Sequence, residues 1–76
     1  MIQSLTKLKN GKNAKIIALK GGIGLNKNLE SLNIRTGKQI TKITSHPFSG
    51  PIIVNVENRA IAIGRGMAEK IFVEEI

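Results

Sequence analysis

Side chains that could bind a metal or catalyse a reaction are few in this chain of 76 residues. His46 is its only histidine, cysteine and aspartate are absent, and the five acidic residues are scattered glutamates. Ferrous sites typically combine two histidines with a carboxylate, and a serine triad needs a histidine and an acid beside the nucleophile. The sequence therefore predicts no metal site, no catalytic residue and a protein that is not an enzyme.

The glycine cluster at Gly21, Gly22 and Gly24 resembles the start of a phosphate-binding loop. A dinucleotide fingerprint requires a third glycine where this chain has Lys27, and no nucleoside-triphosphate loop motif is present. We expect these glycines to turn the chain from a strand into a helix, with no nucleotide cofactor. The start of that helix, near Lys20 and Lys27, could still attract a phosphate or a carboxylate of a partner.

The whole chain has a formal net charge of +7, and its positive charge is concentrated in the first half. Residues 1–42 contain nine lysines and arginines and one glutamate, whereas residues 43–76 contain three basic residues and four glutamates. This asymmetry indicates an acidic protein surface, a nucleic acid or an anionic membrane as the partner, although lysine-rich surfaces also serve solubility.

Aromatic residues, which decide between some of these partners, are limited to Phe48 and Phe72. Single-stranded nucleic acids are bound by stacking bases on aromatic side chains, and polyproline ligands need an aromatic-lined groove. Both modes are disfavoured here. A basic barrel module that contacts a nucleic-acid duplex electrostatically remains the alternative function.

Short alternating segments indicate that most of the chain forms β-strands. Ile52, Val54 and Val56 alternate with Ile53, Asn55 and Glu57, and Ile61 and Ile63 alternate with the smaller Ala60 and Ala62. This pattern predicts a hairpin with one apolar face and its turn at Asn58-Arg59. Further strands are expected at Ala14–Lys20, Lys38–Thr44 and Ile71–Ile76, and one helical turn at Met67–Glu69.

One segment has helical periodicity instead. Leu25, Leu29 and Leu32 recur at i, i+4 and i+7, so they share one face of a short helix. Asn33 follows the last leucine, where a left-handed residue commonly ends a helix.

These elements predict one all-β domain over residues 1–76: a small barrel of about five strands with a helical insertion after the first strand. Closure of the sheet would remove exposed edges, and small residues (Ala14, Ala18, Ala60, Ala62 and Ala68) would fit a narrow interior. The run Ile52-Ile53-Val54 is far too short to span a membrane, and the N-terminal residues lack a signal-peptide pattern.

In its order of motifs the whole chain resembles the ferrous iron transport protein A (FeoA) family. The resemblance lies in Gly21-Gly22-x-Gly24, Leu29-x-x-Leu32-x-Ile34-x-x-Gly37, Gly50-Pro51-Ile52-x-Val54-x-Val56, Ile61-Ala62-Ile63 and Ala68-x-x-Ile71-x-Val73. The family usually has Arg and Gly where this chain has Asn28 and Asn33. Asn33 can still adopt the left-handed conformation, whereas Asn28 cannot make the contacts of a guanidinium.

The resemblance implies an SH3-like barrel that is cytoplasmic, not an enzyme, and free of cofactors. Its implied partner is the cytosolic GTP-binding domain of the membrane permease for ferrous iron, which would recruit it to the inner face of the membrane. Some metal-dependent repressors contain a related domain beside a helix-turn-helix region, for which this chain has no room. No small-molecule substrate and no membrane insertion are expected.

The expected partner surface consists of apolar residues left outside the core and of basic residues that flank the helix and steer an acidic partner. We predict that its members are Lys20, Ile23, Leu25, Lys27, Arg35, Lys38, Ile53 and Met67.

Overall fold

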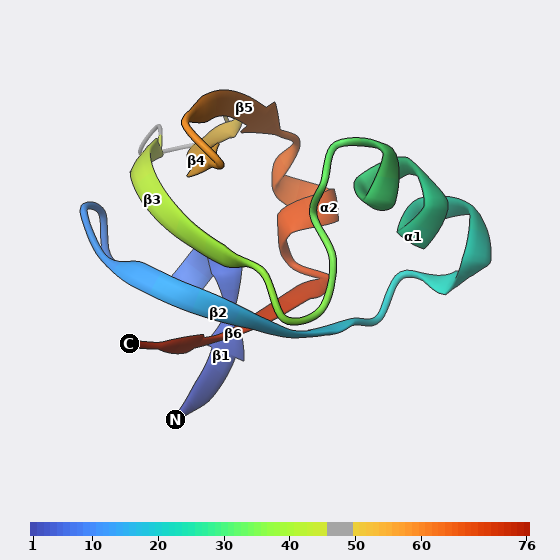
Figure 1. Cartoon of the computed structure of the whole chain (residues 1–76), viewed down its shortest axis with the longest axis horizontal. Helices are drawn as coiled ribbons and strands as arrows, with labels where there is room; N and C mark the ends of the chain where they lie inside the picture. Colours follow the sequence, from blue (N-terminus) through green and yellow to red (C-terminus); the bar gives the residue numbers. More distant parts are fainter. Residues whose placement is uncertain (46–49) are drawn as a thin grey trace.

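A six-stranded antiparallel sheet forms the framework of the computed structural model, which describes residues 1–45 and 50–76 (Figure 1). Its strand order is β1-β6-β2-β3-β4-β5. The strands are β1 (Ile2–Ser4), β2 (Asn13–Leu19), β3 (Gln39–Ser45), β4 (Ile52–Val56), β5 (Arg59–Ile63) and β6 (Ile71–Glu75). The helical elements are the 3-10 turn η1 (Leu5–Lys7), α1 (Gly22–Ser31) and α2 (Arg65–Ala68). His46 and Phe48 lie outside the described residues.

The five expected strands are present, and the sequence missed one more at the N-terminus. β1 has three residues and pairs with β6, with Gln3 opposite Val73. Three residues are too few to produce a periodic signal, so only the pairing with β6 defines this strand. As a result, the helical insertion follows the second strand, not the first, and β1 and β5 are the two ends of the hydrogen-bonded order.

Two irregularities bend the sheet around the core. The register shifts between Ile16 and Ala18 in β2 and between Lys42 and Thr44 in β3. An extra residue of this kind bends a strand and increases its twist. The enclosed core is apolar and consists of Leu5, Leu8, Ala14, Ile16, Leu29, Ile34, Ile40, Ile52, Val54, Val56, Ile63, Ala68, Ile71 and Val73. Of the small residues expected inside, Ala14 and Ala68 are buried, but Ala60 and Ala62 are exposed.

The β4–β5 hairpin turns at Glu57 and Asn58, one residue earlier than the sequence indicated. Both residues have positive φ, 52° and 63°, and Val56 pairs with Arg59. Positive φ at both central positions characterises the tight turns that match the twist of a hairpin. Asn is common there but Glu is not, so the residue types gave a weak signal for the register.

One charged side chain lies inside the core. Lys42 on β3 is only 2% exposed, and its Nζ donates hydrogen bonds to the carbonyl oxygens of Leu5 (3.2 Å), Thr6 (3.1 Å) and Leu8 (2.6 Å). These carbonyls belong to η1 and its C-terminal end, so the ammonium joins the chain after β1 to the middle of the sheet. Burial of the ammonium and, second, the positive charge of Arg65 lower the pKa of Lys42 from its ordinary 10.5.

We expect Lys42→Met to destabilise the fold by about 1–3 kcal/mol, because the substitution removes the ammonium donor from the buried carbonyl of Leu8 and from those of Leu5 and Thr6. Urea unfolding followed by circular dichroism measures the effect. Lys15→Met is the matched control, since Lys15 is an exposed lysine on β2. Equal stability of the two variants would contradict a stabilising role for the buried ammonium.

The lowered pKa also gives a pH dependence with a definite sign. Between the folded pKa and 10.5 the unfolded chain binds more protons at Lys42 than the folded chain, so the free energy of unfolding rises with pH. Lys42→Met removes this term. The stability difference between the native protein and Lys42→Met should therefore widen as pH rises toward 10.5, and a constant difference would show that the group is not perturbed.

Candidate partner-binding surface

The start of α1 depends on two glycines. Gly22 has a φ of +84°, which a residue with a side chain rarely adopts, and Gly21 precedes it as the N-cap. A Cβ at Gly21 would lie 2.9 Å from the Cβ of Leu25 and still closer to the end of that side chain. Leu25 can therefore pack back over the start of its own helix only because residue 21 has no side chain.

The apolar face of α1 agrees with the sequence pattern at two of its three leucines. Leu29 is fully buried, and Leu25 is half-buried against the core. Leu32 is 37% exposed at the C-cap, one residue beyond the end of the helix. Asn33 has a φ of 65°, which confirms the predicted left-handed residue after the helix.

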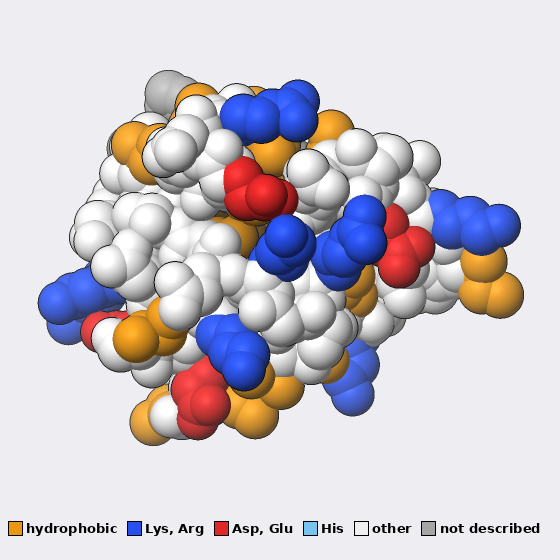
Figure 2. Space-filling view, in the orientation of Figure 1, with side chains coloured by type: hydrophobic (Ala, Val, Ile, Leu, Met, Phe, Trp, Pro, Cys, Tyr) orange, Lys and Arg blue, Asp and Glu red, His pale blue; other side chains and the backbone are white. Residues whose placement is uncertain are grey.

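The opposite side of α1 presents an apolar side chain beside a basic one. Ile23 is 79% exposed, and Lys27 is also exposed. They are four residues apart, so they lie on the same side of the helix. Figure 2 shows a hydrophobic and a basic side chain together at the end of the molecule formed by α1. Asn26 donates a hydrogen bond from Nδ2 to the carbonyl of Leu19 (3.4 Å), which links the helix to the end of β2.

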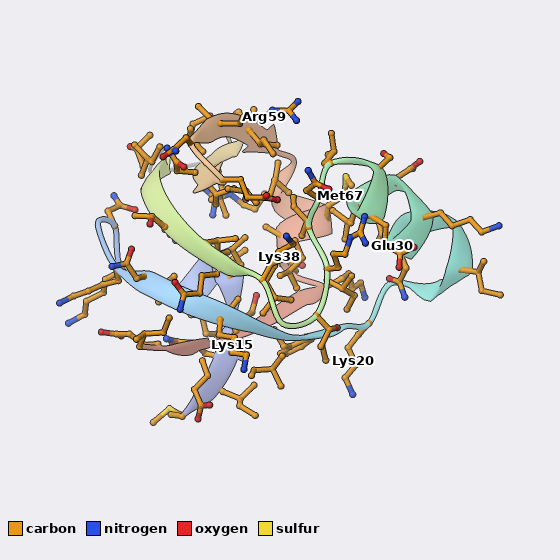
Figure 3. All side chains as sticks on the ribbon, viewed as in Figure 1. Lys15, Lys20, Glu30, Lys38, Arg59 and Met67 are labelled. Carbon is orange, nitrogen blue, oxygen red and sulfur yellow. The ribbon has the colours of Figure 1, made fainter. Side chains whose placement is uncertain are left out.

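The other predicted basic residues lie before and after the helix. Lys20 is exposed between β2 and α1, and its backbone N–H donates to the carbonyl of Lys70 (2.9 Å). Arg35 is exposed in the segment between α1 and β3. Lys38 is half-buried, and its Nζ lies 3.2 Å from a carboxylate oxygen of Glu57 (Figure 3 labels this lysine). This ion pair partly compensates the Lys38 charge, so Lys20, Lys27 and Arg35 are the stronger candidates for steering.

Two of the predicted apolar residues belong to other parts of the molecule. Met67 lies in α2 and packs partly buried against the core. Ile53 is half-buried on the outer face of β4, opposite Ala62 of β5 and Thr44 of β3. The helix and its flanking segments thus provide Lys20, Ile23, Leu25, Lys27, Arg35 and Lys38, whereas Ile53 belongs to a separate face.

Lys42 is the residue whose placement the charge count did not reveal. A signal was present, because alternation along the strand places Lys42 on the same face as the buried Ile40.

Within residues 1–45 and 50–76 there is no group of three or more potential metal ligands. In the same residues, neither helix has the length and hydropathy needed to cross a bilayer.

A family model for the FeoA domain matches residues 3–75. The chain belongs to the FeoA family. A Methanocaldococcus jannaschii protein assigned as an Fe(2+) transport protein A is 34% identical over 67 residues, which are 88% of this chain and 79% of that protein. FeoA proteins are small accessory proteins associated with Fe(2+) transport.

Solved structures agree with this assignment. The crystal structure of an iron uptake regulatory protein (FeoA) superposes with a TM-score of 0.93 at 30% identity, with all of both chains covered. The fold is SH3-like, as the sequence resemblance implied. It also recurs in a manganese-dependent transcriptional repressor, with a TM-score of 0.90 at 16% identity over 99% of this chain and 42% of the repressor. That similarity is one of fold alone.

We expect Gly21→Ala to destabilise the protein by about 1–3 kcal/mol, because the added methyl group forces Leu25 out of its packed position. Gly24→Ala is the matched control within α1. Its Cβ meets open space, and alanine favours a helix by about 0.5–1 kcal/mol over glycine. Thermal unfolding should therefore give shifts of opposite sign, and a stabilised Gly21→Ala variant would refute the packing argument.

Proposed function

We propose that this FeoA-family chain is a cytoplasmic accessory protein of ferrous iron uptake, without catalytic activity of its own. It binds the cytosolic GTP-binding domain of the Fe(II) permease and modulates that protein through direct contacts. The permease then recruits it to the inner face of the membrane. The observation that carries the proposal is the exposed Ile23 beside Lys27 on α1, in a chain that belongs to an Fe(2+) transport family.

The anchoring of α1 suits a docking helix. Leu29 and Leu25 fix one side of the helix on the core, so Ile23 is presented from a defined position on the other side. An apolar side chain on a helical backbone that is already formed requires no further ordering of the backbone when it enters a pocket of a partner. Ile23 is therefore the expected anchor of the interface, whereas Leu25 and Met67 pack against the core.

The charges around α1 favour an acidic partner surface. Lys20, Lys27 and Arg35 are exposed before, on and after the helix, and Glu30 is the only acidic residue of α1. Charges at the rim of an interface mainly raise the association rate, and salt screens them. We therefore expect Ile23 to contribute mainly to the affinity of the complex and the basic residues mainly to its association rate.

The test is titration of the isotope-labelled protein with the soluble GTP-binding domain of the cognate permease, followed by amide chemical shifts. We expect saturable shifts confined to α1 and its flanking segments. Ile23→Glu should weaken binding about 30-fold or more, as for a central apolar anchor. Ile43→Glu is the matched control, because Ile43 is also exposed (44%) but lies on β3. Equal losses in both variants, or no shifts at all, would overturn the proposal.

Charge reversal tests the steering role separately. Lys27→Glu should slow association about several-fold at low salt with little change at high salt. Lys9→Glu makes the same charge change at an exposed residue before β2. If a DNA duplex instead produces shifts across residues 7–42 that vanish with salt, and the permease domain produces none, the nucleic-acid alternative replaces this proposal.

A further inference from the structure

Among the described residues, no strand pairs with the outer edge of β5. β5 pairs with β4 through Val56–Arg59, Val54–Ile61 and Ile52–Ile63, and it is the last strand in the sheet order. Figure 1 shows it at the upper border of the molecule. In a two-residue hairpin the residues that flank the turn exchange hydrogen bonds, and the pairs then alternate. The N–H and C=O groups of Ala60 and Ala62 therefore point away from β4.

This edge lacks the features that normally keep strand edges apart. In most proteins an exposed edge strand is short, or it contains a lysine, a proline or a bulge that prevents another strand from pairing with it. The other edge, β1, has only three residues. β5 has five residues and pairs regularly with β4. Its one charged residue, Arg59, stands at the turn end of the strand, and no charged residue or proline occurs from Ala60 to Ile63.

We propose that the β5 edge pairs with β5 of a second copy of this chain, giving a symmetric antiparallel dimer with a continuous twelve-stranded sheet. Two strand edges pair through the residues whose backbone N–H and C=O groups point away from their own sheet. Ala60 must therefore lie opposite Ala62 of the second copy, and Ala62 opposite Ala60. This register centres the two-fold axis on Ile61. It is the register in which both alanines of each copy exchange hydrogen bonds.

The side chains fit this register. Ala60 and Ala62 are exposed on the outer face, and their small methyl groups let the two backbones approach without a clash. Ile53 lies beside Ala62 on the same face, so the apolar surface continues across the new strand pair. The same register keeps the two Arg59 side chains apart, because each lies opposite Ile63 of the second copy.

Charge and size set the strength of this dimer. A five-residue edge buries less surface than a stable interface needs, so association is weak and depends on protein concentration. Each copy has a net charge of +7, and repulsion between the copies opposes their approach. Salt screens the repulsion, so the dimer strengthens as salt rises. A contact with nucleic acid would show the opposite salt dependence.

Sedimentation equilibrium of the native chain over a wide concentration range, at low and high salt, tests the association. We expect a monomer–dimer equilibrium that shifts toward the dimer at high salt. A mixture of ¹⁵N-labelled and ¹³C-labelled protein should give intermolecular contacts between Ala60 and Ala62. A chain that stays monomeric at millimolar concentration in high salt would overturn the proposal, as would intermolecular contacts at β1.

Two variants distinguish the edge from the outer face. Ala62→Lys places like charges diagonally across the new strand pair and should weaken the dimer about ten-fold or more. Thr44→Lys adds the same charge at an exposed position on β3, inside the sheet, and should leave the dimer intact. Equal weakening by both variants, with amide spectra that confirm folding, would assign the contact to the outer face and overturn the edge pairing. Neither result depends on binding of the permease.

Discussion

The ammonium of Lys42 is the interaction on which the rest of this small domain depends. It replaces its lost water with three backbone carbonyls of the segment where η1 leads out of β1, and that of Leu5 also accepts from the N–H of Leu8. The same residue joins the loop before β2 through its backbone, since its N–H donates to Lys12 and its carbonyl accepts from Gly11. Lys42 thus connects the N-terminal strand, the following loop and the middle of the sheet at one point. A chain of 76 residues has few apolar residues with which to make such a connection otherwise.

Most of the fold could be predicted from the sequence, because its signals were local. The alternation in β4 and β5, the leucines of α1 and the left-handed Asn33 each depend on neighbouring residues, and each appears in the structure. What escaped prediction depends on contacts distant in the chain. β1 exists because β6 lies beside it, and the turn at Glu57 is fixed by the pairing of the strands on either side. Burial of Lys42 requires carbonyls that are 34–37 residues away.

The same division applies to the candidate surface. Composition indicated basic residues around an amphipathic helix, and Ile23 and Lys27 are indeed exposed there. Composition could not show that Lys38 would be paired with Glu57, or that Ile53 would face away from the helix beside Ala62. Those outcomes depend on strand register. A one-residue change of register moves each side chain to the opposite face of a strand, and charge counts contain no information about register.

α1 is inserted between two strands that are direct neighbours. The insertion leaves β2 and returns to β3, and its return is fixed where Gly37 donates to the carbonyl of Ile16 and Ile16 donates to that of Lys38, both at 2.8 Å. The pairing of β2 with β3 depends little on the length of the segment between them, because closing a longer or shorter loop costs little additional entropy. The inserted segment nevertheless contributes to the core through Leu25, Leu29 and Ile34. The candidate surface on α1 is therefore attached to the framework by these three apolar side chains and by the strand pairing on either side of the insertion.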